Sequence, residues 1–443
     1  MYRNSLFCSR NATHVLLLVM GCLLWTITNT SCHRAHRTKS SVRSCYGGSA
    51  TQEMTDVSYW NPSDTIILTP EQIVQYNNEL IAQGNLDLVD ITIQNPIISK
   101  DVVEKGIAKY TIANSWKWLD TMLITAEDKQ ALYESRNLGQ LNDSIIVRYG
   151  VITHPTDMRS FPTDKVSSKD KVVEGPQCYD RFQETQLRLG EGVHIWHQTA
   201  DGEWFFVRAT DYAGWIKSKH VGLCTYEDMC AYIQKEPFCV VTDIYDQTIQ
   251  DVTMRLNMGT KLPYNTQKNK ALAPIRMHDG SLAICETTMA GDIHQGYLPY
   301  TTLNVLTLAF KQQGFPYDWG CKNGYNDCSG LAQSVYRCMG IQLPRNTSSM
   351  RRIQRNMHSE GGINFDYTQF MPGSILLSQG HTMILVGTID KNPIIIHAFG
   401  SYKQPPTWEK RQVSATCITS MSDLYWTDGE RSIESIGHVY EIK

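Results

Sequence analysis

The feature that most constrains the fold is a series of short strand-like segments between residues 144 and 223. "SIIVRYGVIT", "GVHIWHQT" and "EWFFVRAT" are rich in β-branched and aromatic residues, and Asp201-Gly202 predicts a hairpin turn between the last two. "DYAGWIKSKHVG" adds a further short strand. About five such strands in so short a stretch are typical of a small barrel. Because residues 238–292 form a second β-rich block, we expect two small barrels in tandem.

The remaining chain must form further domains, since 443 residues are too many for one ordinary core. Residues 61–142 have a mostly helical pattern. Thr69 predicts an N-cap, Pro70 the first helical position and Gln72 a capping box, and a second helix begins similarly at Thr125. This region shows no catalytic constellation, so we expect a packing or positioning domain.

A third kind of pattern begins near residue 294. "TTLNVLTLAFKQQG" predicts a helix that ends at Gly314. "GSILLSQGHTMILVGTIDKNPIIIHAFG" predicts two strands joined by a turn at "DKNP". A helical part followed by a sheet indicates an α+β unit.

The N-terminus has the pattern of an export signal over residues 1–31. Arg3 and Arg10 precede the apolar run from Val15 to Trp25, which is too short to span a bilayer as a mature helix. A buried helix is the alternative reading. We expect export to the periplasm or cell envelope.

The segment "LLVMGC" also resembles a lipobox, with Cys22 as the residue that would be lipidated. The apolar residues after Cys22 depart from that pattern, so ordinary cleavage near Thr30 or Ser31 is the alternative. We interpret the polar residues 32–60 as a linker.

Charge and cysteine usage exclude some functions. The net charge is −3, so the large basic footprint of a nucleic-acid-binding protein is absent. The thirteen cysteines include no CxxC pair, which argues against a structural zinc site, and we predict no metal. Export would allow disulfides, whose pairing the sequence does not assign.

The segment "NDCSGLAQSVYRCMG" places a cysteine where a helix begins. Leu331, Val335 and Cys338 follow Cys328 at helical spacing, so Cys328 lies in the first turn. Unpaired backbone N–H groups and the positive end of the helix dipole favour a thiolate there. Cys328 is therefore a candidate nucleophile, and Cys338 is expected to pack in the core.

Two downstream histidines complete a candidate site. His381 stands at the start of an apolar strand, and His397 lies near the end of the next. A hairpin about "DKNP" would bring both rings together, with His381 as base and His397 as its orienting partner. A single histidine in a strand is more often structural, but two on paired strands after such a cysteine favour catalysis.

"GFPYDWG…DCSGLAQSVYRCMGIQLPRNTS" resembles the signature of the NlpC family, the papain-like cysteine peptidases of the bacterial cell wall. "GHTMILVG" and "IIIHAFG" are similar to its two histidine segments. The resemblance covers residues 295–400 and implies a Cys328, His381 and His397 triad. Neither it nor thiol–imidazole chemistry implies a cofactor.

"YDRFQETQLRLGEGVHIWHQTADGEWFFVRATDYAGWI" resembles the first bacterial SH3-like barrel of a multidomain branch of this family. The branch layout implies a multidomain α+β chain. Its parts would be a helical N-terminal domain at 61–142, SH3-like barrels at 143–223 and 224–293, and a papain-like peptidase domain at 294–443.

That branch is similar to γ-D-glutamyl-L-diamino-acid endopeptidases, which cut murein stem peptides with a free N-terminal L-Ala. The resemblance implies substrate contacts at Tyr317, Trp319, Asp327, Ser329, Asn346 and Thr347. Glu184 and Tyr212 are candidates for the L-Ala pocket in the first barrel, since a carboxylate suits a buried ammonium. Asn346 stands where the family has Asp, and Cys321 where it has Gly.

The sequence thus predicts an exported endopeptidase that acts on peptidoglycan-derived peptides. We expect it to be a monomer that does not bind nucleic acid. Whether a lipid anchors it to the membrane is left open. One alternative is a cell-wall-binding protein in which the tandem barrels act and the peptidase unit is secondary. Another is an acyltransferase or amidase that uses the same cysteine and histidine. The sequence leaves open whether the diamino acid is diaminopimelate or lysine.

Overall fold

The computed structural model describes residues 45–119, 122–168 and 179–443. The predicted export signal, with Cys22, and the first part of the expected linker lie outside these residues. The chain is a multidomain α+β protein, as the sequence predicts. Among the described helices, none combines the length and the apolar character that crossing a membrane requires.

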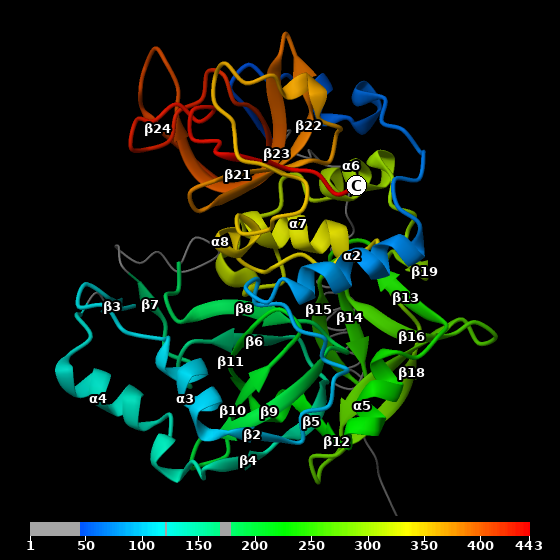
Figure 1. Cartoon of the computed structure of the whole chain (residues 1–443), viewed down its shortest axis with the longest axis vertical. Helices are drawn as coiled ribbons and strands as arrows, with labels where there is room; N and C mark the ends of the chain where they lie inside the picture. Colours follow the sequence, from blue (N-terminus) through cyan, green and yellow to red (C-terminus); the bar gives the residue numbers. More distant parts are fainter. Residues whose placement is uncertain (1–44, 120–121, 169–178) are drawn as a thin grey trace, which may run out of the picture. The chain divides into compact units, whose positions relative to one another are not determined.

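The C-terminal unit is built on a seven-stranded sheet in the order β1-β24-β23-β22-β21-β25-β20 (Figure 1). Its neighbours pair antiparallel except β1 and β24, which run parallel. The strands are β1 Tyr46–Gly47, β20 Met357–His358, β21 Ile375–Ser378, β22 His381–Ile389, β23 Asn392–Lys403, β24 Lys410–Ser420 and β25 His438–Tyr440.

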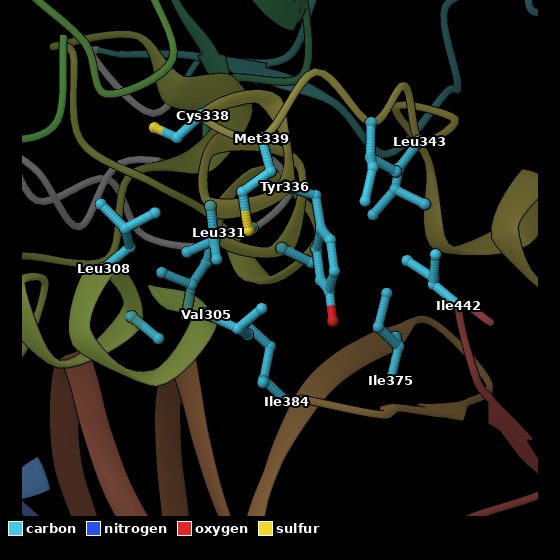
Figure 2. Close-up of a cluster of buried hydrophobic side chains, with 14 of the residues drawn as sticks. Val305, Leu308, Leu331, Tyr336, Cys338, Met339, Leu343, Ile375, Ile384 and Ile442 are labelled. Carbon is cyan, nitrogen blue, oxygen red and sulfur yellow. The ribbon is translucent and has the colours of Figure 1, made fainter. Parts of the chain in front are cut away.

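Both faces of this sheet are buried, because its central strands are apolar at nearly every position. Ile384 and Ile396 face a large core that also receives the helices α2 (Pro70–Ala82), α6 (Thr302–Lys311) and α7 (Cys328–Arg337). Figure 2 shows the helical side of this core, where Tyr336 of α7 points toward Ile375 and Ile384. The intervening residues Met383, Leu385 and Ile395 face a second cluster on the other side.

The predicted hairpin at "DKNP" is present. Asp390 and Lys391 both have positive φ (49° and 68°) and connect β22 directly to β23. The upstream segment differs from the prediction, because Gln379 and Gly380 form an additional turn that splits it into β21 and β22. Gly380, at φ 90°, permits that turn, and His381 is consequently the first residue of β22.

The first β-unit is a seven-stranded sheet in the order β12-β5-β9-β10-β11-β6-β8. The turn at Asp201-Gly202 joins β9 to β10 as predicted. Its core includes Phe206 and Trp215, which have no exposed surface. The strands are β5 Arg148–Ile152, β6 Thr156–Arg159, β8 Gln183–Leu187, β9 Gly192–Gln198, β10 Trp204–Arg208, β11 Ala213–Lys217 and β12 Val221–Cys224.

The second β-unit has a five-stranded sheet in the order β18-β17-β16-β13-β19 and a separate β14–β15 hairpin. A short helix, α5 (Tyr226–Ile233), precedes it. Val241, Leu256 and Leu262 form part of its own core. Its strands are β13 Phe238–Val241, β14 Tyr245–Ile249, β15 Val252–Leu256, β16 Lys261–Asn265, β17 Lys270–Arg276, β18 Leu282–Thr287 and β19 Ile293–Gln295.

The helices of residues 61–142 do not share one core. α2, which starts with the predicted Thr69–Gln72 capping box, buries Tyr76 and Leu80 in the core of the C-terminal unit. α3 (Lys100–Ala108) buries Val103 and Ile107 in the first β-unit, and α4 (Ala126–Glu134) also packs there. The region also holds strand β2 (Ile97–Ser99), which pairs with β4 (Ser144–Ile146), and strand β3 (Lys117–Trp118), which pairs with β7 (Ser167–Ser168).

The described end of the expected linker is part of the C-terminal unit. Cys45 forms a disulfide with Cys417 of β24, and β1 pairs alongside that strand. Met54 is buried in the sheet's helical core. The linker interpretation is therefore wrong for residues 45–60, because polar composition did not reveal these long-range attachments.

Candidate active site

The helix α7 begins at Cys328, as the sequence predicts. Asp327 is its N-cap, and the Asp327 carboxylate accepts a hydrogen bond from the Gly330 N–H at 2.8 Å. Leu331, which Figure 2 labels, and Val335 lie on the buried face of α7 in the same core as Ile384 of the sheet. The candidate nucleophile is thus placed at the end of a helix that is fixed by the main core.

A buried ion pair fixes the start of this helix. The Arg345 guanidinium donates to Asp327 Oδ2 at 2.6 Å and to Ser329 Oγ at 2.9 Å, and Arg345 is only 2% exposed. The Gly320 N–H donates to the same Asp327 oxygen at 3.0 Å. The Asp327 and Ser329 side chains are buried and hydrogen bonded within the protein, where they hold the residues around Cys328. The expected substrate contacts of these two residues stay a prediction, and sequence reasoning missed Arg345.

The two predicted histidines are brought together. His381 Nε2 lies 2.7 Å from His397 Nδ1, on neighbouring strands β22 and β23. His397 has no exposed surface, and its Nε2 lies 3.0 Å from Thr419 Oγ1 of β24. The hydrogen-bonded series His381–His397–Thr419 therefore extends from the start of β22 into the sheet. Thr419 was not predicted from the sequence.

Aromatic rings cover the histidine pair. Phe399 stacks on His397 with ring centroids 4.0 Å apart, and the Trp426 ring lies 5.4 Å from that of His381. Burial behind these rings lowers the pKa of His381 to about 4, and it holds the pKa of His397 well below its usual value. Both imidazoles are therefore neutral at pH 7. Sequence reasoning missed both aromatic residues.

The thiol lies next to residues that join it to the histidine strand. Cys328 Sγ is 3.9 Å from Thr347 Oγ1, which is 2.7 Å from Thr382 Oγ1. Thr382 directly follows His381, and its backbone also hydrogen bonds the thiol. In the described residues the thiol makes no direct hydrogen bond to His381, a contact that often tightens only when substrate binds.

The electrostatic environment of Cys328 differs from the sequence expectation. Burial, followed by the adjacent Asp327 carboxylate, raises the pKa of the thiol above its usual value. The helix end does not produce a resting thiolate, because Asp327 already occupies the Gly330 N–H of the first turn. The resting site therefore holds a thiol beside a neutral imidazole.

Aromatic residues from two units lie close to Cys328. Tyr317 and Trp319, both predicted, lie 5.6 Å and 5.5 Å from the ring of Tyr179, measured between centroids. Burial and then the nearby Cys328 raise the pKa of Tyr179 and also hold that of Tyr317 well above its usual value. Tyr179 precedes β8 of the first β-unit, and no local pattern in the sequence identified it.

The predicted barrel residues lie against the site. The Tyr212 hydroxyl donates to Glu184 Oε2 at 2.5 Å, and Asn346 Nδ2 donates to the Tyr212 oxygen at 3.3 Å. The structure thereby joins Glu184, Tyr212 and Asn346, which are far apart in sequence. Burial raises the pKa of Glu184, and the Tyr212 hydrogen bond opposes that shift.

Strand β8 fastens the first β-unit to the site. Arg345 Nε donates to Thr185 Oγ1 at 2.8 Å, and Trp319 Nε1 donates to the Gln183 carbonyl at 3.2 Å. Gln183 Nε2 in turn donates to the Gly320 carbonyl at 3.2 Å. The ion pair that fixes Cys328 is thus itself hydrogen bonded to the barrel.

Comparison with known proteins agrees with this arrangement. The NlpC/P60 family model matches residues 314–428, which include Cys328, His381 and His397. The chain carries an NlpC/P60 domain. The model of an SH3 domain (SH3b1 type) matches residues 174–217, within the first β-unit. The NlpC/P60 family comprises cell-wall cysteine peptidases, so residues 314–428 match a cysteine peptidase domain.

A curated protein similar to this chain is the gamma-D-glutamyl-L-lysine dipeptidyl-peptidase of Bacillus cereus. It is 26% identical over 194 residues, which cover 38% of this chain and 54% of the relative. The chain therefore matches about half the length of that relative.

The fold resembles that of a solved NlpC/P60 endopeptidase from Photobacterium damselae subsp. piscicida. The TM-score is 0.68 at 16% identity, and the match covers 87% of this chain and 95% of the other. An NlpC/P60 family protein from Bacillus cereus aligns at a TM-score of 0.45 and 16% identity, over 66% of this chain and 99% of that protein. The likeness to the Photobacterium endopeptidase shows the fold alone.

Proposed function

We propose that this protein is an exported cysteine endopeptidase that hydrolyses the γ-D-glutamyl-L-diamino acid bond of murein stem peptides with a free N-terminal L-Ala. The observation that carries the proposal is the hydrogen-bonded pair of His381 and the buried His397. His381 directly precedes Thr382, whose backbone contacts the Cys328 thiol. Export is part of the proposal and rests on residues 1–31 alone, which leave open whether Cys22 is lipidated or the signal is cleaved near Thr30 or Ser31.

In the first chemical step, His381 removes the thiol proton as Cys328 Sγ attacks the γ-carbonyl carbon of D-Glu. Because His381 Nε2 is turned to His397, Nδ1 is the nitrogen that receives the proton. The tetrahedral oxyanion would be held by the Cys328 backbone N–H at the helix start and by the Tyr317 hydroxyl. The pKa of Tyr317 is well above its usual value, so this hydroxyl stays protonated and can donate.

Collapse of this intermediate breaks the C–N bond. His381 returns its proton to the departing amine of the diamino acid, and the D-Glu acyl group remains on Cys328 as a thioester. A water molecule then loses a proton to His381 and attacks the thioester carbonyl. Release of the new carboxylate regenerates the thiol, so neither step requires a cofactor.

The first β-unit supports the proposed terminal-amine requirement. A dipeptidyl acyl group places its ammonium at a fixed distance from the scissile bond, so a carboxylate beside the cleft can select for it. Glu184 is held in place by the Tyr212 hydroxyl, and Asn346 links both to the segment that contains Thr347. Acetylation of L-Ala would remove the charge that Glu184 binds.

The test is hydrolysis of L-Ala-γ-D-Glu-diaminopimelate and of its L-lysine counterpart by the purified full chain. We expect release of L-Ala-D-Glu and its loss by about 1,000-fold or more in Cys328→Ala. Cys338→Ala is the matched control, since Cys338 is a buried thiol at the end of the same helix. No release from either peptide by folded, reduced protein would overturn the proposal and favour a cell-wall-binding role or another acyl transfer.

A further inference from the structure

The residue that ends the histidine series is the subject of a further inference. Thr419 lies on β24 opposite Ile395, so it is the diagonal neighbour of His397 on the same face of the sheet. Its hydroxyl is 3.0 Å from His397 Nε2, and neither residue has any exposed surface. Bulk water therefore cannot replace Thr419 as the hydrogen-bond partner of His397 Nε2.

The three groups can share their protons in two ways. In the first arrangement, His381 Nε2–H donates to His397 Nδ1 and His397 Nε2–H donates to Thr419 Oγ1. In the second, every hydrogen bond is reversed, so that the Thr419 hydroxyl donates to His397 and His397 Nδ1–H donates to His381 Nε2. Each neutral imidazole carries a single N–H, so these two arrangements exclude each other.

Only the first arrangement leaves His381 able to act as a base toward Cys328. There the His381 proton is on Nε2, and Nδ1 keeps its lone pair. In the second arrangement Nδ1 already carries the proton and cannot accept another from the thiol. The direction of the hydrogen bond at the buried end of the series therefore determines whether the site is active.

We propose that Thr419 is a positioning residue that accepts the hydrogen bond of His397 Nε2–H and so keeps His381 in its basic tautomer. The inference rests on the proposed function, because it assigns a purpose to a base that the proposed reaction needs. Without an acceptor at this place, the first arrangement would leave a buried N–H unpaired, which is costly. The second arrangement would leave only an unused lone pair on His397 Nε2. The equilibrium would therefore shift toward the tautomer of His381 that cannot act as a base.

Thr419→Val tests this, since valine keeps the shape and removes the hydroxyl. We expect kcat to fall about 10- to 100-fold with KM within about twofold, because binding does not involve the tautomer. Thr419→Ser restores the hydroxyl and should keep kcat within about threefold of wild type. Thr416→Val is the matched control: Thr416 is also buried in β24, but it pairs with Ala398 and thus faces away from His397.

A second readout does not depend on turnover. Imidazole 15N NMR of the full chain should show His397 protonated at Nε2 in the wild type and shifted toward Nδ1 in Thr419→Val. An unchanged tautomer or unchanged kcat in Thr419→Val, or equal damage in Thr419→Ser, would overturn the proposal. If the wild-type protein cleaves no murein peptide, the proposed function fails, and the NMR comparison alone decides the role of Thr419.

Discussion

The two β-units contact the same helix in different ways. The first reaches along α7, from Thr185, which binds the Arg345 beside its start, to Asp211, which pairs with Arg337 at 2.7 Å near its end. The second contacts the end of α7, where Cys338 Sγ lies 3.5 Å from the Val241 carbonyl, and its Arg255 donates to the Asn323 carbonyl in the loop before α7 at 3.4 Å. Among the described residues, the first unit and not the second is hydrogen bonded to Arg345, the partner of the Asp327 beside Cys328. A small β-fold can therefore anchor the charged residue beside a candidate nucleophile, or it can only pack against the helix and the loop that carry that nucleophile.

The largest effect is expected where the first unit meets the start of the helix. Arg345→Met would leave the buried Asp327 carboxylate without its partner, so we expect a loss of about 3–5 kcal/mol in the free energy of unfolding and loss of activity. Arg352→Met is the control, because that arginine is 43% exposed and its ion pair with Asp87 is a surface one. Chemical denaturation measures the free energy of unfolding of both variants. Equal losses of stability in Arg345→Met and Arg352→Met would contradict the account.

A core truncation in the second unit should separate stability from chemistry. Leu262 has no exposed surface, so Leu262→Ala should cost about 2–5 kcal/mol in the free energy of unfolding. We expect kcat of the folded variant to stay within about twofold of wild type, since Leu262 lies in the separate core of the second unit and this unit is not hydrogen bonded to Arg345, Asp327 or the histidine pair in the described residues. A large fall in kcat at a temperature where the variant is fully folded would show that the second unit also shapes the site.

Two buried threonines allow a closer comparison. Thr185→Val removes the acceptor of Arg345 Nε, and we expect kcat to fall about 5- to 10-fold with a stability loss of about 1 kcal/mol or somewhat more. Thr260 of the second unit also loses one buried hydrogen bond, to the Asn257 carbonyl, when replaced by valine. Thr260→Val should lose similar stability but keep its kcat. Steady-state kinetics and thermal unfolding of both variants would test this comparison. An equal loss of kcat in Thr185→Val and Thr260→Val would contradict it.

The smallest effect is a shift in pH dependence. His381 must be neutral to accept the thiol proton, and burial lowers its pKa to about 4. With the N-acetylated peptide, whose cleavage does not depend on the charge of Glu184, we expect kcat/KM to be level from about pH 5 to 8 and to fall as the pH drops through about 4 and His381 becomes protonated. Trp426→Ala would expose the ring and move this acid limb upward toward the usual histidine pKa. A wild-type limb near pH 6.5 would contradict the burial argument.

The sequence predicted those parts of the site that have a local signal. Cys328 could be found because a helix start has its own pattern, and His381 and His397 because they stand on two strands joined by a short turn. Thr419, Arg345 and Tyr179 have no such signal, since each acts through contacts that only the tertiary fold creates. For the same reason composition suggested a linker at residues 45–60, although the disulfide between Cys45 and Cys417 ties that segment to β24. The helices of 61–142 were expected as one domain, yet their apolar faces fit two different cores.

The most direct test of the central claim, that the first β-unit completes the peptidase site, is a ratio of rates. We would measure kcat/KM for L-Ala-γ-D-Glu-diaminopimelate and for its N-acetylated copy, in wild type and in Glu184→Gln. Glutamine preserves the hydrogen bond with Tyr212 and removes the charge. The account predicts a strong wild-type preference for the free amine and its collapse in Glu184→Gln, with hydrolysis of the acetylated peptide unchanged. The same preference for the free amine in both proteins would show that the Glu184 carboxylate does not bind the terminal amine of the substrate.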